Sequence, residues 1–342
     1  MEGNHNNHKS TALGASSSAE RRVVLKGSIW MAANAAISRG ASLIAQVVLG
    51  WLLSKEDFAL YAIAISSATI FTMLRNGGSL EILIQKGRQY KEIASVFVKF
   101  SFLFNIGAML ILVAMAPFAA NLYLHDELIG LIIIIAISLP AGTPSVLFRA
   151  KLSIDRRFGS LAKLGLISNI TRQVSMVIFA LLGFGPLSFV LPILLAAVVE
   201  NIVGWRYVKA WPSSNTLTIS KFSEIFIDAK WVMLGALALG LSLQGDFLVI
   251  GLIEPIQDVG VYFFGYQLIF TVAVLFNTSL ESVFPPTFAR MVDDVEKLRS
   301  EFIRALRGVM LLAVPIAFSL TILSPVIIQS IWGGKWDDAI IV

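Results

Sequence analysis

The sequence predicts an all-α polytopic membrane protein, with about nine transmembrane helices arranged in two lobes related by an internal repeat. Three observations support this fold class. The chain of 342 residues is 56% hydrophobic and only 14% charged, which is too apolar for a soluble domain of that length. Long apolar segments recur along the chain, and the basic residues alternate between the loops that separate those segments.

Residues 1–26 are predicted to form a disordered cytoplasmic tail with basic residues at its end. The tail is polar and has no apolar stretch before a small-residue cleavage site, so it does not read as a signal peptide. His5 and His8 lie among Asn and Ser residues, where we expect solvated side chains rather than metal ligands.

Nine apolar segments follow, most of them roughly 20 to 30 residues long, which is enough to cross about 30 Å of hydrocarbon as a helix. They lack the alternating pattern of barrel strands, so helices are predicted. Pro140 and Pro144 are expected to break the helix of the fourth span. The predicted spans are residues 27–53, 58–74, 93–119, 128–148, 158–183, 186–203, 226–253, 259–285 and 302–332.

Lys and Arg crowd every second loop, and the opposite loops hold only Lys55 and Lys335. The positive-inside rule therefore places the N-terminus in the cytoplasm. The net charge of +5 does not indicate nucleic acid, because the basic residues form no stripe with interleaved aromatic residues; membrane lipids are the expected surroundings. The crowded loops contain Arg21, Arg22, Lys26, Lys86, Arg88, Lys91, Arg149, Lys151, Arg156, Arg157, Arg206, Lys209, Lys221, Arg290, Lys297, Arg299, Arg304 and Arg307.

An internal repeat relates the two halves of the chain. The stretch LGWLLSKEDFALY at 49–61 matches IGLIEPIQDVGVY at 250–262, and the tripeptide SLE recurs at 79–81 and 279–281, an offset of about 200 residues. The repeat predicts parallel halves about an axis along the membrane normal, with substrate bound between them. We assign residues 27–210 to a first lobe of six helices, 211–225 to a cytoplasmic linker and 226–342 to a second lobe, which is expected to be incomplete, with three helices and the start of a fourth.

Several stretches, taken in order, resemble the polysaccharide transporters or O-antigen flippases of the superfamily that also contains multidrug exporters. They are KGSIW at 26–30, LLSKEDFALYAIA at 52–64, GGSLEILIQKG at 77–87, FRAKLSIDRRFGSLAKL at 148–164, GDFLVIGLIEPIQDVGVYFFGYQL at 245–268, FPPTFARMVDD at 284–294 and WGGKWDDA at 332–339. The resemblance implies flipping of undecaprenyl-diphosphate-linked oligosaccharide, by alternating access, across the bacterial inner membrane. It also implies a polysaccharide polymerase and a chain-length regulator as partners, and it suggests twelve or more spans where this chain has about nine.

Arg39 and Arg172 are the candidate substrate-binding residues. An arginine near the bilayer centre costs about 2.5–3.5 kcal/mol or more unless it faces water or a partner. The spans that contain the two residues run in the same direction, so their guanidinium groups are expected at similar depth, where each offers a fork to diphosphate or uronate oxygens. Asn34 and Asn169 are expected to bind sugar hydroxyls. The alternative is structural, with the arginines paired between helices and the amides in interhelical hydrogen bonds.

Asp246, with Gln244 and Asn277, is the candidate site for ion coupling. A desolvated carboxylate is suited to carrying a coupling proton, and the three side chains together offer oxygen ligands for sodium. The alternative for Asp246 is a helix-end residue in contact with periplasmic water. Glu200 lies near a predicted cytoplasmic end, where a structural salt bridge is the expected role.

No arrangement of residues for catalysis, metal binding or cofactor binding is recognisable. There is no P-loop or metal-binding motif, His125 lies in a short turn, and the chain has no cysteine. A transporter is therefore predicted, not an enzyme. One alternative is a cation-coupled multidrug exporter, although midplane arginines do not suit a cationic substrate. The other is a membrane polysaccharide polymerase or ligase, although the predicted periplasmic loops are short.

Overall fold

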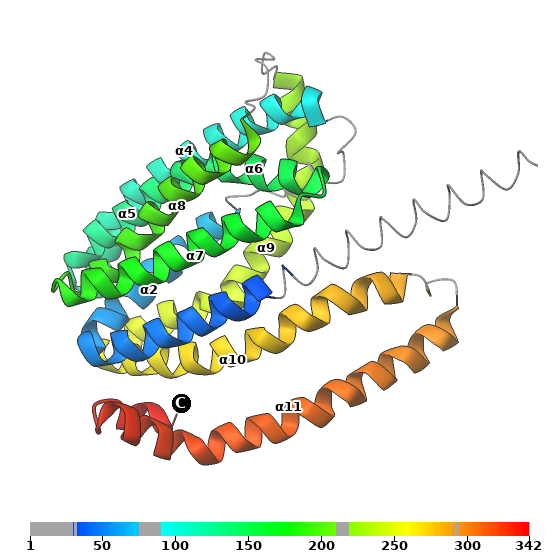
Figure 1. Ribbon diagram of the computed structural model, residues 1–342. Helices are drawn as coiled ribbons and strands as arrows, with labels where there is room; N and C mark the ends of the chain where they lie inside the picture. Colours follow the sequence, from blue (N-terminus) through cyan, green and yellow to red (C-terminus); the bar gives the residue numbers. More distant parts are fainter. Residues whose placement is uncertain are drawn as a thin grey trace, which may run out of the picture.

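The computed structural model describes residue 30 and residues 33–74, 90–209, 219–289, 291 and 294–341, and nearly all of these residues are helical (Figure 1). The first described helix runs from Ala33 to Leu52. The others are α2 (Lys55–Leu74), α4 (Tyr90–Tyr123), α5 (Glu127–Ala141), α6 (Thr143–Ile154), α7 (Phe158–Leu181), α8 (Leu187–Val208), α9 (Ile219–Ile253), α10 (Ile256–Ala289), α11 (Val295–Trp332) and the short 3-10 helix η2 (Asp337–Ile340).

The predicted all-helical membrane fold is confirmed. Six described helices are long and apolar enough to cross a membrane, and there are up to seven if the bent pair α5 and α6 counts as one span. Helices α2 and α10 coincide with two further predicted spans but are not among these candidates, so the count of nine spans stays a prediction. The six are Ala33–Leu52, Ala94–Tyr123, Phe158–Leu181, Leu187–Val208, Met233–Ile253 and Val295–Trp332.

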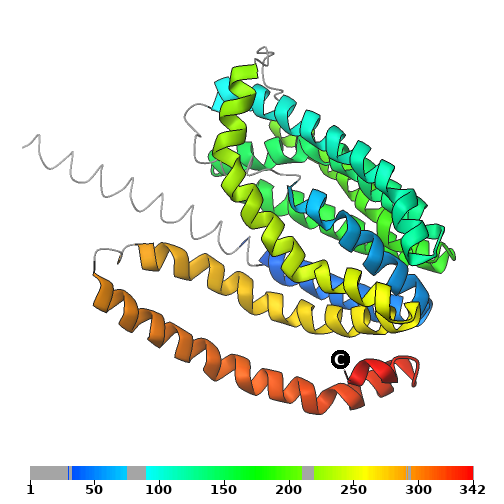
Figure 2. The same cartoon turned by 180° about the vertical axis from the view of Figure 1, so that it is seen from behind.

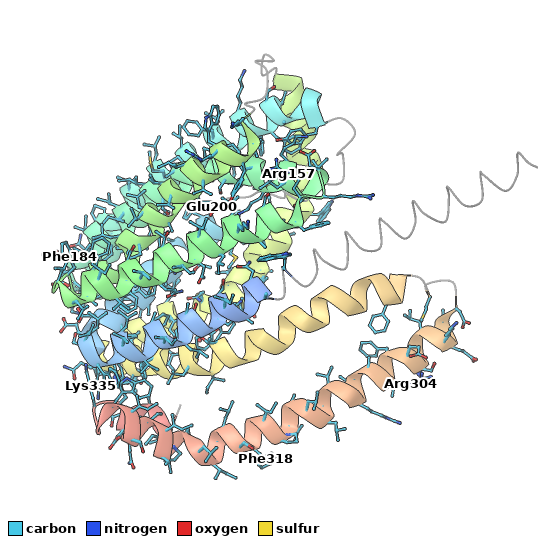
Figure 3. The ribbon with its side chains drawn as sticks, in the orientation of Figure 1. Arg157, Phe184, Glu200, Arg304, Phe318 and Lys335 are labelled. Carbon is cyan, nitrogen blue, oxygen red and sulfur yellow. The ribbon has the colours of Figure 1, made fainter. Side chains whose placement is uncertain are left out.

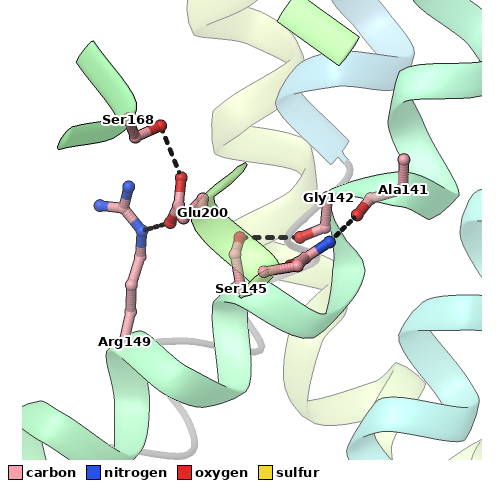
Figure 4. A network of polar contacts seen from close by, with 7 residues as sticks. Ala141, Gly142, Ser145, Arg149, Ser168 and Glu200 are labelled. Atoms are coloured by element: carbon pink, nitrogen blue, oxygen red, sulfur yellow. Dashed lines mark hydrogen bonds and ion pairs between the residues drawn. The ribbon is translucent and has the colours of Figure 1, made fainter. Parts of the chain in front are cut away.

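The fourth predicted span is broken where the sequence places its prolines. Helices α5 and α6 meet at Gly142 with a bend of 41°, Pro140 lies in the last turn of α5, and Pro144 lies in the first turn of α6. Proline has no backbone N–H to donate and its ring disfavours a continuous helix, which accounts for the break. Two side chains bond to main-chain carbonyls at the bend: Ser145 Oγ donates to the Gly142 carbonyl at 2.8 Å, and Asn201 Nδ2 donates to the Ala141 carbonyl at 2.6 Å (Figure 4).

An ion pair next to this bend ties three helices together. Arg149 of α6 donates from Nε to Glu200 Oε1 of α8 at 2.5 Å, and Ser168 of α7 donates to Glu200 Oε2 at 2.9 Å (Figure 4). Glu200 is buried, with 7% of its surface exposed. Both carboxylate oxygens are thus satisfied, and Glu200 makes the structural salt bridge expected of it.

Helix α2 lies at the centre of the bundle, between α5, α9 and α10. Its inner positions carry small side chains, among them Ala59, Ala62 and Ala68, which are fully buried. Small residues let helix backbones approach closely, and in lipid this packing replaces the hydrophobic effect as the source of association. Helices α4, α5, α7 and α8 form one group beyond α2, whereas α11 runs along the outside of the bundle in both views (Figures 1 and 2).

The repeat in the sequence reappears in the helices. The turn at 53–54 joins the first described helix to α2, and the turn at 254–255 joins α9 to α10. These two turns occupy equivalent places in the two repeated stretches. Helices α2 and α10 also start at the same end of the bundle, because a Cβ at Gly260, near the start of α10, would overlap the carbonyl of Lys55. This arrangement fits parallel halves; the division into lobes at 210 and 226 stays a prediction.

Candidate functional site: a cavity lined by two arginines

A cavity of about 220 Å³ lies between the first described helix and helices α2, α7, α8 and α10. Each of the longer contributions comes from one helix face, because the residues are spaced three, four or seven positions apart. The lining residues are Arg39, Ser42, Gln46, Leu49, Phe58, Tyr61, Asn169, Arg172, Gln173, Met176, Phe189, Phe263, Gln267, Phe270 and Thr271. Four of the five helices belong to the predicted first lobe and α10 belongs to the second, so the cavity lies between the two predicted lobes.

The charge of the cavity is positive. Arg39 and Arg172 both line it, and among the described lining residues none is Asp or Glu. Two guanidinium groups that line the same cavity repel each other unless an anion lies between them. The cavity therefore favours an anionic ligand and disfavours a cationic one.

Several polar atoms in the cavity wall have no partner within the described part of the chain. They are Gln46 Nε2, Asn169 Oδ1 and Arg172 Nε, all three buried. Buried polar atoms are almost always hydrogen-bonded, so such atoms call for water or a ligand. Next to them, Gln173 Nε2 donates to Ser42 Oγ at 2.8 Å, a bond that fixes α7 against the first described helix.

One end of the cavity is closed by aromatic side chains. Tyr61 stacks on Phe189 at 4.5 Å between ring centroids, and Phe58 meets Phe189 edge to face at 5.0 Å. Phe263 of α10 lies against Tyr61 at 5.6 Å. These four residues, which we call the aromatic floor, are nearly inaccessible to solvent. They lie toward the end of the bundle that carries the turns at 53–54 and 254–255.

The structure brings three of the four predicted substrate-binding residues together. Arg39, Arg172 and Asn169 line the cavity, whereas Asn34 does not. Asn34 accepts a hydrogen bond from Ser38 Oγ at 3.3 Å, and its amide nitrogen faces Gly165 of α7. That position fits the structural alternative for Asn34, an amide between helices.

Sequence reasoning missed the uncharged polar lining. Ser42 and Gln46 follow Arg39 by three and seven residues, Gln173 follows Asn169 by four, and Gln267 and Thr271 of α10 are four residues apart. Their signal was this helical spacing, since residues three, four and seven positions apart share a helix face.

The predicted coupling residues point to different neighbours. Asp246 Oδ2 accepts a hydrogen bond from the Tyr262 hydroxyl at 2.8 Å, and its Oδ1 is buried without a partner within the described part of the chain. Gln244 Oε1 instead accepts from Ser66 Oγ of α2 at 3.1 Å. The structure does not bring Gln244 and Asp246 together, and the side chain of Asn277 lies outside the described residues.

Comparison with known proteins decides the family. Residues 48–341 match the sequence profile of a family described as polysaccharide biosynthesis protein. The chain belongs to this family. The resemblance to polysaccharide transporters is thereby confirmed at the family level, and the chain is a multi-pass membrane protein.

Three characterised relatives share 21–23% identity with the chain. Teichuronic acid biosynthesis protein TuaB of Bacillus subtilis (strain 168) is 21% identical over 259 residues, 75% of this chain and 54% of the relative. Lipopolysaccharide biosynthesis protein WzxC of Escherichia coli (strain K12) is 23% identical over 332 residues, 94% of this chain and 65% of the relative. Succinoglycan biosynthesis transport protein ExoT of Rhizobium meliloti (strain 1021) is 23% identical over 301 residues, 88% of this chain and 60% of the relative.

The chain thus spans between 54% and 65% of the length of these relatives. No solved structure matches it significantly.

Proposed function

We propose that this protein is a flippase for lipid-linked oligosaccharide, and that the cavity binds the diphosphate or uronate groups of the substrate. The observation that carries the proposal is the pair of arginines, Arg39 and Arg172, in a cavity whose described lining has no carboxylate. The family supports a polysaccharide precursor as substrate, as do relatives named for lipopolysaccharide, teichuronic acid and succinoglycan biosynthesis.

The lining suits a sugar phosphate in two respects. Guanidinium groups bind phosphate oxygens through paired charge-assisted hydrogen bonds, which offset the cost of keeping arginine within the membrane. The amides of Gln46, Asn169 and Gln173 add donors and acceptors of the kind that sugar hydroxyls use. In this mechanism the substrate enters from the cytoplasmic leaflet, the cavity closes behind it, and the opposite end opens toward the periplasm.

The two alternative functions fit the structure less well. A cation-coupled multidrug exporter needs acidic as well as aromatic contacts for its substrate, whereas the described lining of this cavity has aromatic rings but no carboxylate, and its charges are positive. A polymerase or ligase needs a substantial loop on the predicted periplasmic side, but the described turns that join one long helix to the next at that end are short: residues 53–54, 124–126, 182–186 and 254–255.

The remaining assignments complete the proposal. We place the protein in the bacterial inner membrane with a cytoplasmic N-terminus, alongside a polysaccharide polymerase and a chain-length regulator. Proton coupling through Asp246 is favoured over sodium coupling, because Asp246 Oδ1 has no partner within the described residues and Gln244 faces another helix.

Ligand binding by the purified protein tests the cavity directly. With undecaprenyl diphosphate as the probe, Arg39→Ala and Arg172→Ala are each expected to weaken binding about 10- to 100-fold, because each removes charge-assisted hydrogen bonds worth roughly 1.5–3 kcal/mol. Arg39→Lys should restore part of the loss, since a lysine supplies the charge without the fork. The dissociation constant is measured by intrinsic tryptophan fluorescence.

Arg304→Ala is the matched control. Arg304 is an exposed arginine on α11 that pairs with Glu301, so its removal changes the net charge by the same amount outside the cavity. Binding by this variant should equal that of the unmodified protein. If Arg39→Ala and Arg172→Ala bind the probe as well as Arg304→Ala does, the cavity is not the anion site.

A further inference from the structure

The segment after α11 folds back onto the end of the first described helix. Lys335 Nζ donates to three main-chain carbonyls there: Gly50 at 3.1 Å, Trp51 at 3.2 Å and Leu53 at 2.6 Å. Carbonyls in the last turn of a helix have no intrahelical partner and carry partial negative charge. A lysine from about 280 residues away in the chain therefore caps this helix, and Figure 3 shows Lys335 at that end of the bundle.

Two tryptophans of the same segment add main-chain contacts. Trp336 Nε1 donates to the Gly50 carbonyl at 2.9 Å, and Trp332 Nε1 donates to the Val47 carbonyl at 3.1 Å. Gly50 makes this approach possible, because a Cβ at that position would overlap the Trp332 indole. The contact therefore depends both on the tryptophans of the segment after α11 and on the glycine of the first described helix.

Trp336 also connects this contact to the cavity. Its ring stacks on Phe264 at 3.9 Å and meets Phe58 edge to face at 5.1 Å. Phe58 belongs to the aromatic floor and lines the cavity. From the end of the bundle inward, the order is Lys335, Trp336, aromatic floor and arginine cavity.

We propose that residues 332–339 form a latch that holds this end of the cavity closed, with Lys335 as its positioning residue. Release of Lys335 and Trp336 from the first described helix lets the aromatic floor part and opens the cavity at the end predicted to be periplasmic. The proposal rests on the flippase function only in that it assigns this opening to the export step of an alternating-access cycle.

The bonding of Lys335 suits a contact that must break in every cycle. It joins an ammonium group to carbonyls at a helix end, and water can take the place of either partner once the segment moves away. Burial lowers the pKa of the Lys335 ammonium, and the Asp57 carboxylate acts in the opposite direction. Desolvation thus offsets part of the gain from the three hydrogen bonds, which keeps the latch reversible.

Accessibility of the cavity tests the latch without any ligand. The chain has no cysteine, so Ser42→Cys places a single thiol in the cavity. An impermeant maleimide added to intact spheroplasts should label this thiol slowly, and addition of Lys335→Ala or Trp336→Ala should raise the rate at least fivefold. In inside-out vesicles the same variants should be labelled more slowly than the parent, because opening one end closes the other.

Two controls keep the result interpretable. Lys151→Ala removes a lysine that pairs with Asp155 at the opposite end of the bundle and should leave labelling of Ser42→Cys unchanged. Leu124→Cys, in an exposed turn, should be labelled at one rate in every background. Trp336→Phe keeps an aromatic ring but loses the hydrogen bond to Gly50, so an intermediate rate is expected even if Lys335→Ala folds poorly.

Unchanged labelling of Ser42→Cys in monodisperse Lys335→Ala and Trp336→Ala protein would overturn the latch and leave the anion-binding result standing. Faster labelling from both sides would also overturn it, because that pattern indicates a loosened bundle rather than a gate. Failure of the arginine variants to affect probe binding would reject the proposed function without altering these rates.

Discussion

The two carboxylate oxygens of Asp246 differ in their hydrogen bonding. Tyr262 on α10 holds Oδ2, while Oδ1 is buried without a partner within the described residues. Next to Tyr262 is Phe263 of the aromatic floor, and next to Asp246 is Phe247. The ring centroids of Phe263 and Phe247 are 5.2 Å apart. The Asp246 side chain is therefore hydrogen-bonded to the helix that forms one wall of the cavity.

The prediction for Asp246 concerns how binding depends on pH. If its protonation is linked to substrate binding, affinity for undecaprenyl diphosphate must change with pH in the unmodified protein, and linkage makes the effect reciprocal. Asp246→Asn has no proton to gain or lose at this position. Across the same pH range, the change in its dissociation constant should therefore be at least about fivefold smaller than the change in the parent. Asp258→Asn, an exposed acid at the start of α10, is the control and should behave as the parent. Equal pH dependence in all three proteins would assign Asp246 a structural role.

Charged and uncharged residues of the cavity differ in how far the sequence predicted them. Arg39 and Arg172 were predictable because a guanidinium group within an apolar span is costly and needs a reason. Gln46 and Asn34 look alike in the sequence, since amides within spans commonly bond between helices. They differ only in the face of the first described helix that carries them. In the folded protein the face with Gln46 lines the cavity, whereas the face with Asn34 lies against Gly165.

At the scale of elements, α2 and α10 meet at equivalent positions of the repeat. Ala59 and Gly260 are the eleventh residues of the two repeated stretches, and a Cβ at Gly260 would lie 3.3 Å from the Ala59 backbone nitrogen. Equivalent residues touch each other where a two-fold axis passes between two copies. This contact fits the predicted two-fold relation of the halves, with its axis between α2 and α10 near their shared end.

This close approach predicts a strong effect of one methyl group. Gly260→Ala should destabilise the protein by about 2 kcal/mol or more, because the new Cβ overlaps the main chain of α2, which cannot move aside as a flexible side chain would. Gly130→Ala on α5 is the matched control, since its Cβ meets nothing within 4 Å and alanine is the better helix former. Thermal unfolding in detergent should show a lower midpoint for Gly260→Ala only; equal midpoints would contradict the packing of α2 on α10.

Sequence features that act within a few residues predicted the helices well, whereas contacts between residues far apart in the chain could not be predicted. The apolar segments predicted the helices, and Pro140 and Pro144 predicted the bend between α5 and α6. Hydrophobic segments and prolines both determine structure within a few residues of their own position. The contact of Lys335 with the first described helix joins residues about 280 positions apart, and nothing near Lys335 in the sequence points to its partner.

At the scale of the whole molecule, the two ends of the bundle differ in charge. Figure 3 places Phe184 and Lys335 at one end and Arg157 and Arg304 at the other. The two lysines that depart from the charge alternation both have specific partners: Lys335 caps a helix, and Lys55 pairs with Asp338 at 2.5 Å. Their presence at the sparse end therefore does not weaken the orientation inferred from the basic loops.

Orientation is tested by single cysteines at the two ends. Leu124→Cys, Gln257→Cys and Asp337→Cys, all at exposed positions of the sparse end, should react with an impermeant maleimide in intact spheroplasts. Asp155→Cys and Glu296→Cys, exposed at the basic end, should react only after permeabilisation, because positively charged loops remain in the cytoplasm. The unmodified chain has no cysteine and provides the blank. The reverse pattern would invert the protein in the membrane and would turn the latch at Lys335 toward the cytoplasm. A mixed pattern within either group would mean that its residues do not share one side of the membrane, and would contradict the positions of their helix ends in the bundle.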